Sequence, residues 1–220
     1  MLHLILADSE LETIPKKIAS KKKIGKRAKK KNREPTELVL DSNYDHEAMK
    51  EIPDAKRRGR PDIIHVCILS ALDTPLNKEG LLRFYVHTRQ NKVIRINPET
   101  RIPRSYNRFI GLIEQLFSIK EVPPDNPLLS LSDESLEKLI NEINPEKTIT
   151  FKIDGQKIER EILFNNLKKN DDVCVIIGGF PHGDFLSEVE KISDEIITIY
   201  KDALEALTVV NHVIHFYEDP

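Results

Sequence analysis

The stretch DDVCVIIGGFPHGDF (171–185) indicates the fold class, because an apolar run of strand length leads directly into a glycine-rich loop. In α/β sheets, ligands bind just beyond the carboxyl ends of such buried strands, and glycine lets a ligand approach the backbone closely. Taken alone, the pair Gly178-Gly179 is equally well explained as an ordinary turn between a strand and a helix. The absence of GxGxxG and Walker A patterns argues against a dinucleotide fold and a P-loop.

Apolar runs on both sides of this stretch predict further strands. Strands are expected at 2–7, at 38–43, at 194–200, and as a hairpin formed by 81–88 and 92–97. Asp154-Gly155 lies between two β-like runs within 148–160 and predicts a second hairpin.

Helices are predicted from capping signals and apolar spacing. They are expected at 63–72 with Pro61 in the first turn, at 105–116, at 133–143 with Ser132-Asp133 as cap, and at 203–217. Strands that alternate with helices predict an α/β fold with a mostly parallel sheet and helices on both faces.

The composition fits one α/β domain over residues 1–220. No apolar run approaches the roughly 20 residues that a membrane span needs, so no membrane partner is expected. Cys67 and Cys174 stand alone inside apolar runs, which is typical of buried thiols in a reducing compartment. The seven histidines form no ligand-like cluster, so no metal site is predicted.

Charge is segregated along the chain. Residues 1–110 carry 24 Lys and Arg against 14 Asp and Glu, whereas residues 111–220 carry 10 against 22. This asymmetry suggests a polyanion partner for the first half, with a chance distribution of solvated charges as the alternative. The run KKIASKKKIGKRAKKKNR (16–33) is predicted to be a basic flexible loop at 15–34, which either binds a polyanion or only adds solubility.

Several long motifs resemble a known family. IGGFPHGDF (177–185), IITIYKDALEA (196–206) and the final helix resemble the C-terminal part of SPOUT-class methyltransferases, in which a trefoil knot holds S-adenosylmethionine. RRGRPDIIHVCILSALDTPLNKEG (57–80) and INPETRIPRSYNRFIGLIEQL (96–116) resemble one branch, the ribosome-biogenesis family of small-subunit rRNA pseudouridine-N1-methyltransferases. The likeness to this nucleolar essential protein family, in its archaeal form, extends from about Asp41 to the end.

The resemblance implies a SPOUT-type knotted fold with an inserted β-hairpin and a family-specific RNA-binding insertion at about 80–110. It also implies methylation of N1 of a pseudouridine in small-subunit rRNA, with S-adenosyl-L-methionine as the methyl donor. The implied donor-binding residues are Gly178, Gly183, Ile196, Ile197, Thr198, Ile199, Tyr200 and Lys201. The implied rRNA-binding residues are Arg60, Arg101, Arg104 and Arg108, with Asp62 beside them.

Some of these residues have more than one interpretation. Asp62 is expected to pair with and orient an arginine, and the other interpretation is a catalytic base. Asp73 is expected to brace the turn beside the site. Tyr106 and Phe109 either stack on a splayed base or belong to the core. The isoleucines at 197 and 199 suit core packing as well as a donor pocket.

The resemblance further implies a homodimer, an rRNA partner, contacts with ribosome assembly factors, and a cytoplasmic location, or a nucleolar one in a eukaryote. Two rival functions stay open at this point. One is a non-catalytic rRNA-binding assembly factor, and the other is a methyltransferase of the same fold that acts on a different base. The sequence identifies no dedicated general base.

Overall fold

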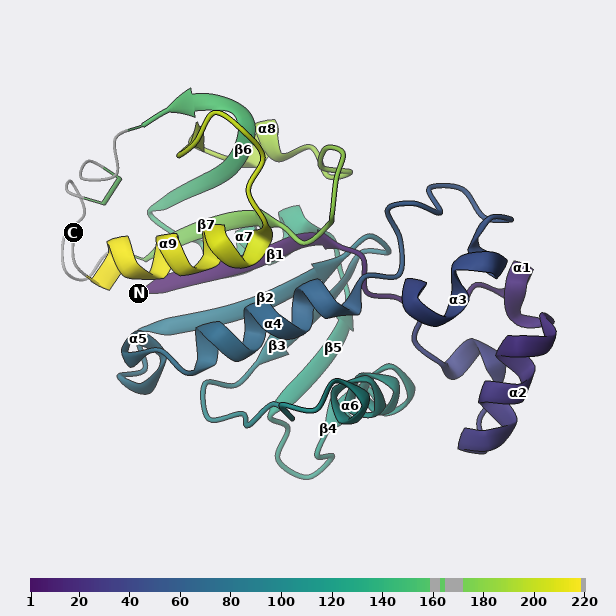
Figure 1. Cartoon of the computed structure of the whole chain (residues 1–220). Helices are drawn as coiled ribbons and strands as arrows, with labels where there is room; N and C mark the ends of the chain where they lie inside the picture. The colour runs from purple at the N-terminus through teal and green to yellow at the C-terminus, as the bar shows by residue number, and fades with distance from the viewer. Residues whose placement is uncertain (159–162, 165–171, 219–220) are drawn as a thin grey trace.

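The computed structural model describes residues 1–158, 163–164 and 172–218, and its centre is one eight-stranded sheet (Figure 1). The strand order across the sheet is β4-β5-β3-β2-β1-β7-β6-β8. The strands are β1 (Leu2–Ser9), β2 (Leu82–Thr88), β3 (Lys92–Ile96), β4 (Glu121–Val122), β5 (Leu129–Asp133), β6 (Lys147–Lys157), β7 (Val173–Gly178) and β8 (Glu195–Thr198).

The sheet divides into a parallel and an antiparallel part. β1 lies parallel to both β2 and β7, and β6 lies parallel to both β7 and β8. The predicted hairpin is confirmed as β2–β3, and β5 and β4 continue the antiparallel pairing beyond it. The expectation of a mostly parallel sheet therefore holds where β1, β6, β7 and β8 lie. The first hairpin strand, β2, is part of the central sheet because it also pairs with β1.

The predicted hairpin at Asp154-Gly155 is wrong over the described residues. β6 runs through this pair as one eleven-residue strand, with an irregularity in its pairing to β8 between Phe151 and Gln156. A Cβ on Gly155 would lie 2.6 Å from the backbone carbonyl carbon of Ile197. The glycine thus allows close approach of two strands rather than a turn. Residues 159–160 of the predicted hairpin, and residue 171 at the start of the stretch 171–185, lie outside the described residues.

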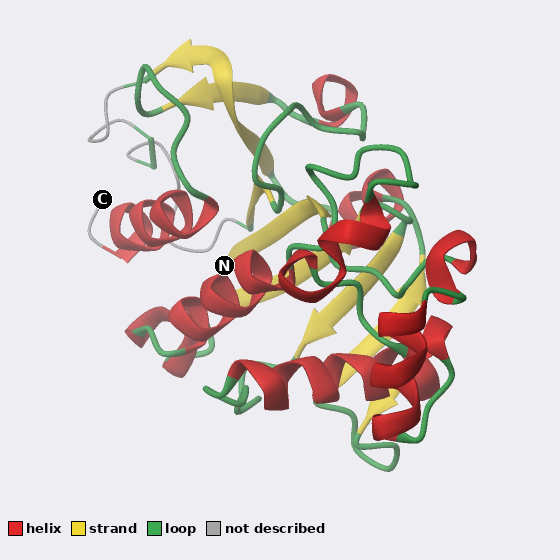
Figure 2. Cartoon of the chain, turned by 45° about the vertical axis from the view of Figure 1, so that its right-hand side comes forward, coloured by secondary structure: helices red, strands yellow, loops and turns green. Residues whose placement is uncertain are grey.

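Helices cover both faces of the sheet (Figure 2). Leu2, Leu4 and Leu6 of β1 contribute to the larger core with α4 (Pro61–Leu72), α6 (Tyr106–Ile119) and α9 (Ala206–Glu218). Ile5 and Ala7 face a second core with α7 (Leu136–Ile143) and α8 (Val189–Ile192). Alternate residues of a strand point to opposite faces, so β1 serves both cores. The predicted helices over 63–72, 105–116 and 203–217 are confirmed within a few residues.

Residues 16–33 do not form the predicted flexible loop. They fold into α1 (Lys16–Ala19) and α2 (Lys22–Lys31), which lie with α3 (Ser42–Met49) in a lobe at one end of the molecule (Figure 1). Buried apolar side chains give this lobe a core of its own, formed by Ile14, Ile18, Ile24, Ala28, Leu38, Leu40, Met49 and Ile52. The lysines dominate the composition of residues 16–33 and conceal the spacing of the apolar residues Ile18, Ile24 and Ala28.

Two further predictions are wrong in detail. The expected strand at 38–43 makes only an isolated bridge from Val39 to Thr13, and Ser42 already begins α3. Ser132-Asp133 belongs to β5, and Ser135 caps α7 instead by accepting the backbone N–H of Lys138. The apolar run at 38–40 is buried in two cores without pairing as a strand. Ser132-Asp133 was misassigned because short polar residues suit a cap, a turn and an edge strand equally well.

The two cysteines behave as predicted. Cys67 and Cys174 are buried and unbridged, and burial raises the pKa of each thiol to about 12. Along the described ranges, no helix combines the length and hydropathy that crossing a membrane requires.

Candidate functional site

A cavity of about 300 Å³ lies where the loop after β7 meets the loop after β8. Six of the eight predicted donor-binding residues line it, namely Gly178, Gly183, Ile197, Thr198, Ile199 and Tyr200. Ile196 and Lys201 lie outside the lining. The β6 strand contributes one wall through Phe151 and Asp154, and the start of α9 contributes Ala206 and Val209. The cavity has the size and largely apolar walls of a small-molecule site.

The glycine-rich loop is shaped by one aromatic ring. A Cβ on Gly178 would lie 2.6 Å from the ring of Phe180, so the ring occupies the space that a side chain would need. The guanidinium of Arg57 lies over a face of this ring, 4.0 Å from its centroid. Gly183 has φ +90°, which side chains rarely adopt. The loop therefore depends on glycine at both positions.

Several carboxylates lie in the lining of the cavity or beside it. Asp154, Asp184 and Asp202 are lining residues, and Lys152 bonds to Asp184 at 3.0 Å and to Glu190 at 2.9 Å. These partners, Glu190 first and then Asp184, raise the pKa of Lys152. An apolar cavity with an excess of carboxylates suits a ligand that carries positive charge, such as the sulfonium and ammonium groups of S-adenosylmethionine.

The buried Asp8 ties the glycine-rich loop to β1. Its carboxylate accepts the backbone N–H groups of Leu186 (2.7 Å) and Ser187 (2.9 Å) and the hydroxyl of Ser187 (2.8 Å). The backbone of Asp8 has φ +49°, an uncommon conformation for a non-glycine residue. Sequence reasoning missed this residue, since an acidic side chain directly after an apolar strand was its only signal.

His87 lies beside Asp8 as a neutral imidazole. Its Nδ1 accepts the backbone N–H of Asp8 at 3.3 Å, and its Nε2 lies 3.1 Å from Asn91 Oδ1. Burial lowers the pKa of His87, against the opposing influence of Asp8. In the folded state this group therefore resists protonation, which would turn the Nδ1 acceptor into a donor facing another donor.

We expect this histidine to make stability depend on pH. The unfolded chain binds a proton at about pH 6.5, while the folded protein does so only at lower pH. The contribution of His87 to the free energy of unfolding is therefore fully present above about pH 6.5 and is lost as pH falls below that value. The midpoint of thermal unfolding should drop between pH 7.5 and pH 5.5, and the drop should be smaller in His87→Asn. It should not vanish, because burial also lowers the pKa of His3. An equal drop in both proteins would contradict the assignment.

A buried ionic network joins the lobe to the sheet near the cavity. Glu10 is fully buried and accepts from Arg57 Nε at 2.6 Å and from Arg89 Nη1 at 3.0 Å. Arg57 also donates to the carbonyl of Asp184 in the glycine-rich loop. Glu12, equally buried, binds Arg58 through both carboxylate oxygens. Arg57 and Arg58 therefore neutralise buried carboxylates and hold the fold together, a role that the sequence alone did not indicate.

Arg60 and Asp62 form a two-bond ion pair at the start of α4. Arg60 Nε lies 2.9 Å from Asp62 Oδ1, and Nη2 lies 2.7 Å from Oδ2. About a third of each side chain remains exposed. This geometry holds the guanidinium plane in one orientation while leaving its outer edge open. The role of Asp62 toward RNA stays a prediction.

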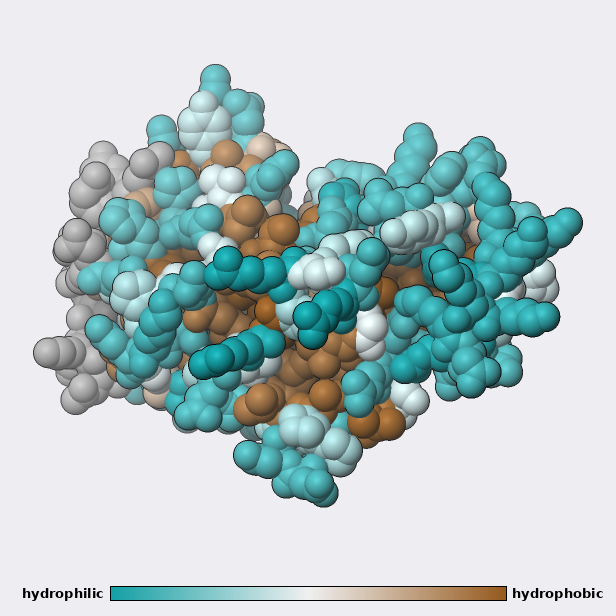
Figure 3. Space-filling view, turned by 60° about the horizontal axis from the view of Figure 1, so that its bottom comes forward, coloured by the Kyte–Doolittle hydropathy of each residue, from teal (hydrophilic) through white to brown (hydrophobic). Residues whose placement is uncertain are grey.

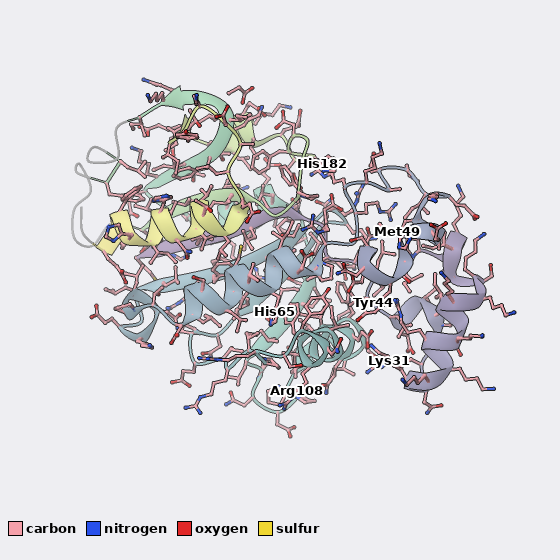
Figure 4. All side chains as sticks on the ribbon, in the orientation of Figure 1. Lys31, Tyr44, Met49, His65, Arg108 and His182 are labelled. Carbon is pink, nitrogen blue, oxygen red and sulfur yellow. The ribbon has the colours of Figure 1, made fainter. Side chains whose placement is uncertain are left out.

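The other predicted arginines are exposed on the segment before α6 and in its first turn. Arg101 and Arg104 line a wide, open depression of about 1400 Å³, together with Asp73. Arg108 lies in the first turn of α6, after the irregular stretch that contains Pro103. Neither Arg60 nor Arg108 lines the depression or the smaller cavity. In the view of Figure 4, Arg108 lies below α4 and His182 of the glycine-rich loop lies above it.

The aromatic residues of this segment are held by the protein itself. Phe109 is fully buried and stacks on His65 with ring centroids 4.3 Å apart, so of its two interpretations the core one is confirmed. Tyr106 is half-buried and donates its hydroxyl to Asp41 at 2.6 Å. Burial, with Asp41 second, raises the pKa of Tyr106. Asp73 pairs with Lys78 at 3.0 Å beside the depression.

Comparison with known proteins gives one consistent family. A family model described as EMG1/NEP1 methyltransferase matches residues 4–218. The ribosomal RNA small subunit methyltransferase Nep1 of Thermococcus sibiricus is 48% identical over 99% of this chain and 98% of its own. The Nep1 of Thermococcus onnurineus is 49% identical with the same coverage. The crystal structure of Archaeoglobus fulgidus Nep1 bound to S-adenosylhomocysteine matches with a TM-score of 0.86 at 33% identity, covering 98% of this chain and 96% of that one.

Proposed function

This chain belongs to the EMG1/NEP1 methyltransferase family, and we propose on that premise that it methylates N1 of a pseudouridine in small-subunit rRNA. It is a small-subunit rRNA methyltransferase that uses S-adenosylmethionine. The observation that carries this function is the match, over nearly the full length, to a structure bound to S-adenosylhomocysteine. The target atom and the role in small-subunit biogenesis are the proposed part.

In the proposal, the methyl donor binds in the cavity beside Gly178 and Gly183. The donor supplies an electrophilic sulfonium methyl group when bound. The chain's own part is to orient the donor. The end of β8 and the loop after it offer backbone groups from Ile197 to Tyr200, and the carboxylates of the lining favour the positive charge. The isoleucine side chains exclude water on the inner side. The proposal includes a trefoil knot that holds the two loops together.

The proposed RNA site consists of Arg60, Arg101, Arg104 and Arg108. Arginine binds phosphate through two parallel hydrogen bonds and also stacks on bases. The proton on N1 of pseudouridine must leave before or during methyl transfer. Guanidinium groups near the base favour the deprotonated form electrostatically. In this proposal Asp62 is a positioning residue that fixes Arg60, and no side chain is assigned as general base.

A homodimer, contacts with ribosome assembly factors and a cytoplasmic location, nucleolar in a eukaryote, complete the proposal. Apolar side chains on α4 and α9 support the homodimer. Val66 is 42% exposed, and Leu69 and Leu207 are only partly buried. Figure 3 shows apolar side chains at the surface in the middle of the molecule.

The arginine site is tested by RNA binding. We expect the double variant Arg104→Ala/Arg108→Ala to bind a hairpin RNA with a loop pseudouridine about 10- to 100-fold more weakly, because each lost contact costs on the order of 1–3 kcal/mol at most and such losses are only partly additive. S-adenosylmethionine binding, measured by calorimetry, should be unchanged. Lys138→Ala on α7 is the control. Unchanged RNA affinity in the double variant would contradict the proposed RNA site.

A further inference from the structure

Helix α2 has two chemically distinct faces. Ile24 and Ala28 are buried in the core of the lobe. The helix has six exposed lysines, and Lys31 among them pairs with Glu114. We call the other five the lysine face: Lys22, Lys23, Lys26, Lys29 and Lys30. At 3.6 residues per turn they fall within an arc of about 120°, on the side away from Ile24 and Ala28.

The basic residues from 21 to 31 divide into two groups by their partners. Three of them pair with carboxylates: Lys21 with Glu51 and Arg27 with Asp45 inside the lobe, and Lys31 with the buried Glu114 of α6, which attaches the lobe to the rest of the protein. Among the described residues, no hydrogen bond or ion pair reaches any ammonium group of the lysine face. Residues 16–33 contain no Asp or Glu that could neutralise it.

This arrangement is unfavourable for the helix in isolation. Lys22 and Lys26, and likewise Lys26 and Lys30, are four residues apart and repel each other. The helix also begins without an acidic residue in its first turn and without a side-chain cap. A solubilising surface would mix both signs of charge. A fixed, single-sign face instead matches a polyanion that neutralises it.

The end of α2 lies beside the proposed RNA site. Lys31 bonds to Glu114 on α6 through both carboxylate oxygens, at 2.7 and 2.9 Å. Arg108 precedes Glu114 on that helix by six residues, about 9 Å along its axis. Figure 4 shows Lys31 and Arg108 both beside α6. Figure 3 shows that the surface of the lobe is almost entirely hydrophilic. Through Lys31, α2 is thus anchored to the helix that carries Arg108.

We propose that the lysine face binds the phosphate backbone of the RNA stem that flanks the target loop. This inference rests on the proposed function, and it assigns two parts of one RNA to two surfaces. The arginines bind the loop that presents the base. Helix α2 binds the phosphates of the adjoining stem and makes no sequence-specific base contacts. RNA is favoured over an acidic protein because α2 is bonded through Lys31 to α6, the helix that carries Arg108 of the proposed RNA site.

The test compares Lys26→Gln/Lys29→Gln with the control Lys138→Gln/Lys191→Gln, whose lysines lie on α7 and α8. Glutamine removes the charge and keeps helix propensity. The probes are a hairpin RNA with a loop pseudouridine and the same loop as a short single strand. For the hairpin, the slope of log affinity against log salt should fall by between about one and two units, because each lost phosphate contact removes roughly 0.7–0.9. Affinity for the short loop should be unchanged.

The charge-reversed pair Lys26→Glu/Lys29→Glu should weaken hairpin binding further, while the control pair should leave slope and affinity unchanged. A hairpin slope in Lys26→Gln/Lys29→Gln equal to that of the parent would overturn the inference, leave the arginine site intact, and point to an acidic protein as the partner of α2. Failure of the parent to bind either RNA would overturn the proposed function itself, and the inference with it.

Discussion

Gly178→Val is expected to reduce the affinity for S-adenosylmethionine by at least about 100-fold, or about 2.7 kcal/mol. A Cβ at this position would already lie 2.6 Å from the ring of Phe180. Arg57, held by Glu10, lies over a face of that ring, and Phe185 packs edge-on against it, so the ring has little freedom to retreat. It should be pushed into the cavity, where the donor would have to lie. Calorimetric titration of the purified variant measures the loss.

Gly111→Ala is the matched control for this prediction. Gly111 lies on α6, and a Cβ there would meet nothing within 4 Å. The control should bind the donor like the parent and gain slightly in stability, since alanine favours helix. A Gly178→Val protein that is folded and binds the donor at parental affinity would show that the cavity is not the donor site.

Glu10→Ala is expected to lower the free energy of unfolding by about 3–5 kcal/mol, because it leaves the buried guanidinium of Arg57 without its carboxylate. Glu10 is fully buried and also accepts from Arg89. The loss should appear as a lower urea midpoint with an unchanged slope. Because Arg57 supports Phe180, the folded fraction should also bind the donor more weakly.

Glu47→Ala provides the comparison for the buried carboxylate. Glu47 pairs with Lys50 at the surface, where both side chains are more than half exposed. Such pairs contribute little in water, so this variant should unfold at the parental urea midpoint. A Glu10→Ala midpoint indistinguishable from that of Glu47→Ala would contradict the role given to the buried network.

Much of the fold could be predicted from the sequence because the decisive segments are regular. β1, β7 and β8 are short apolar runs, and α4, α6 and α9 show clear spacing or a proline start. The predictions that were wrong also have physical reasons. Asp154-Gly155 has the composition of a turn, but the glycine is needed where β6 passes close to β8. The lysines of α2 conceal the burial of Ile24 and Ala28, which depends on residues as distant as Ile52.

The candidate site, too, could be predicted from the sequence only in part. The family resemblance supplied both the arginines and the donor-binding residues. For Gly178 and Gly183 the sequence itself added only a weak signal, a glycine-rich loop after a buried strand. Asp8 and Arg57 were missed because their roles arise only from long-range contacts, such as Asp8 with Ser187 and Arg57 with Phe180. Phe109 was ambiguous in the sequence, and its contact with His65 decides for the core.

The most direct test of the central claim uses two RNAs that differ at one nucleotide. One hairpin carries pseudouridine in its loop and the other carries uridine at the same place. Each is incubated with the protein and S-adenosylmethionine, and its mass is measured. N1 of uridine is bonded to the sugar and cannot accept a methyl group. We predict one added methyl group on the pseudouridine RNA and none on the uridine RNA. Methylation of both RNAs, or of neither by a protein that binds donor and RNA, would contradict the account.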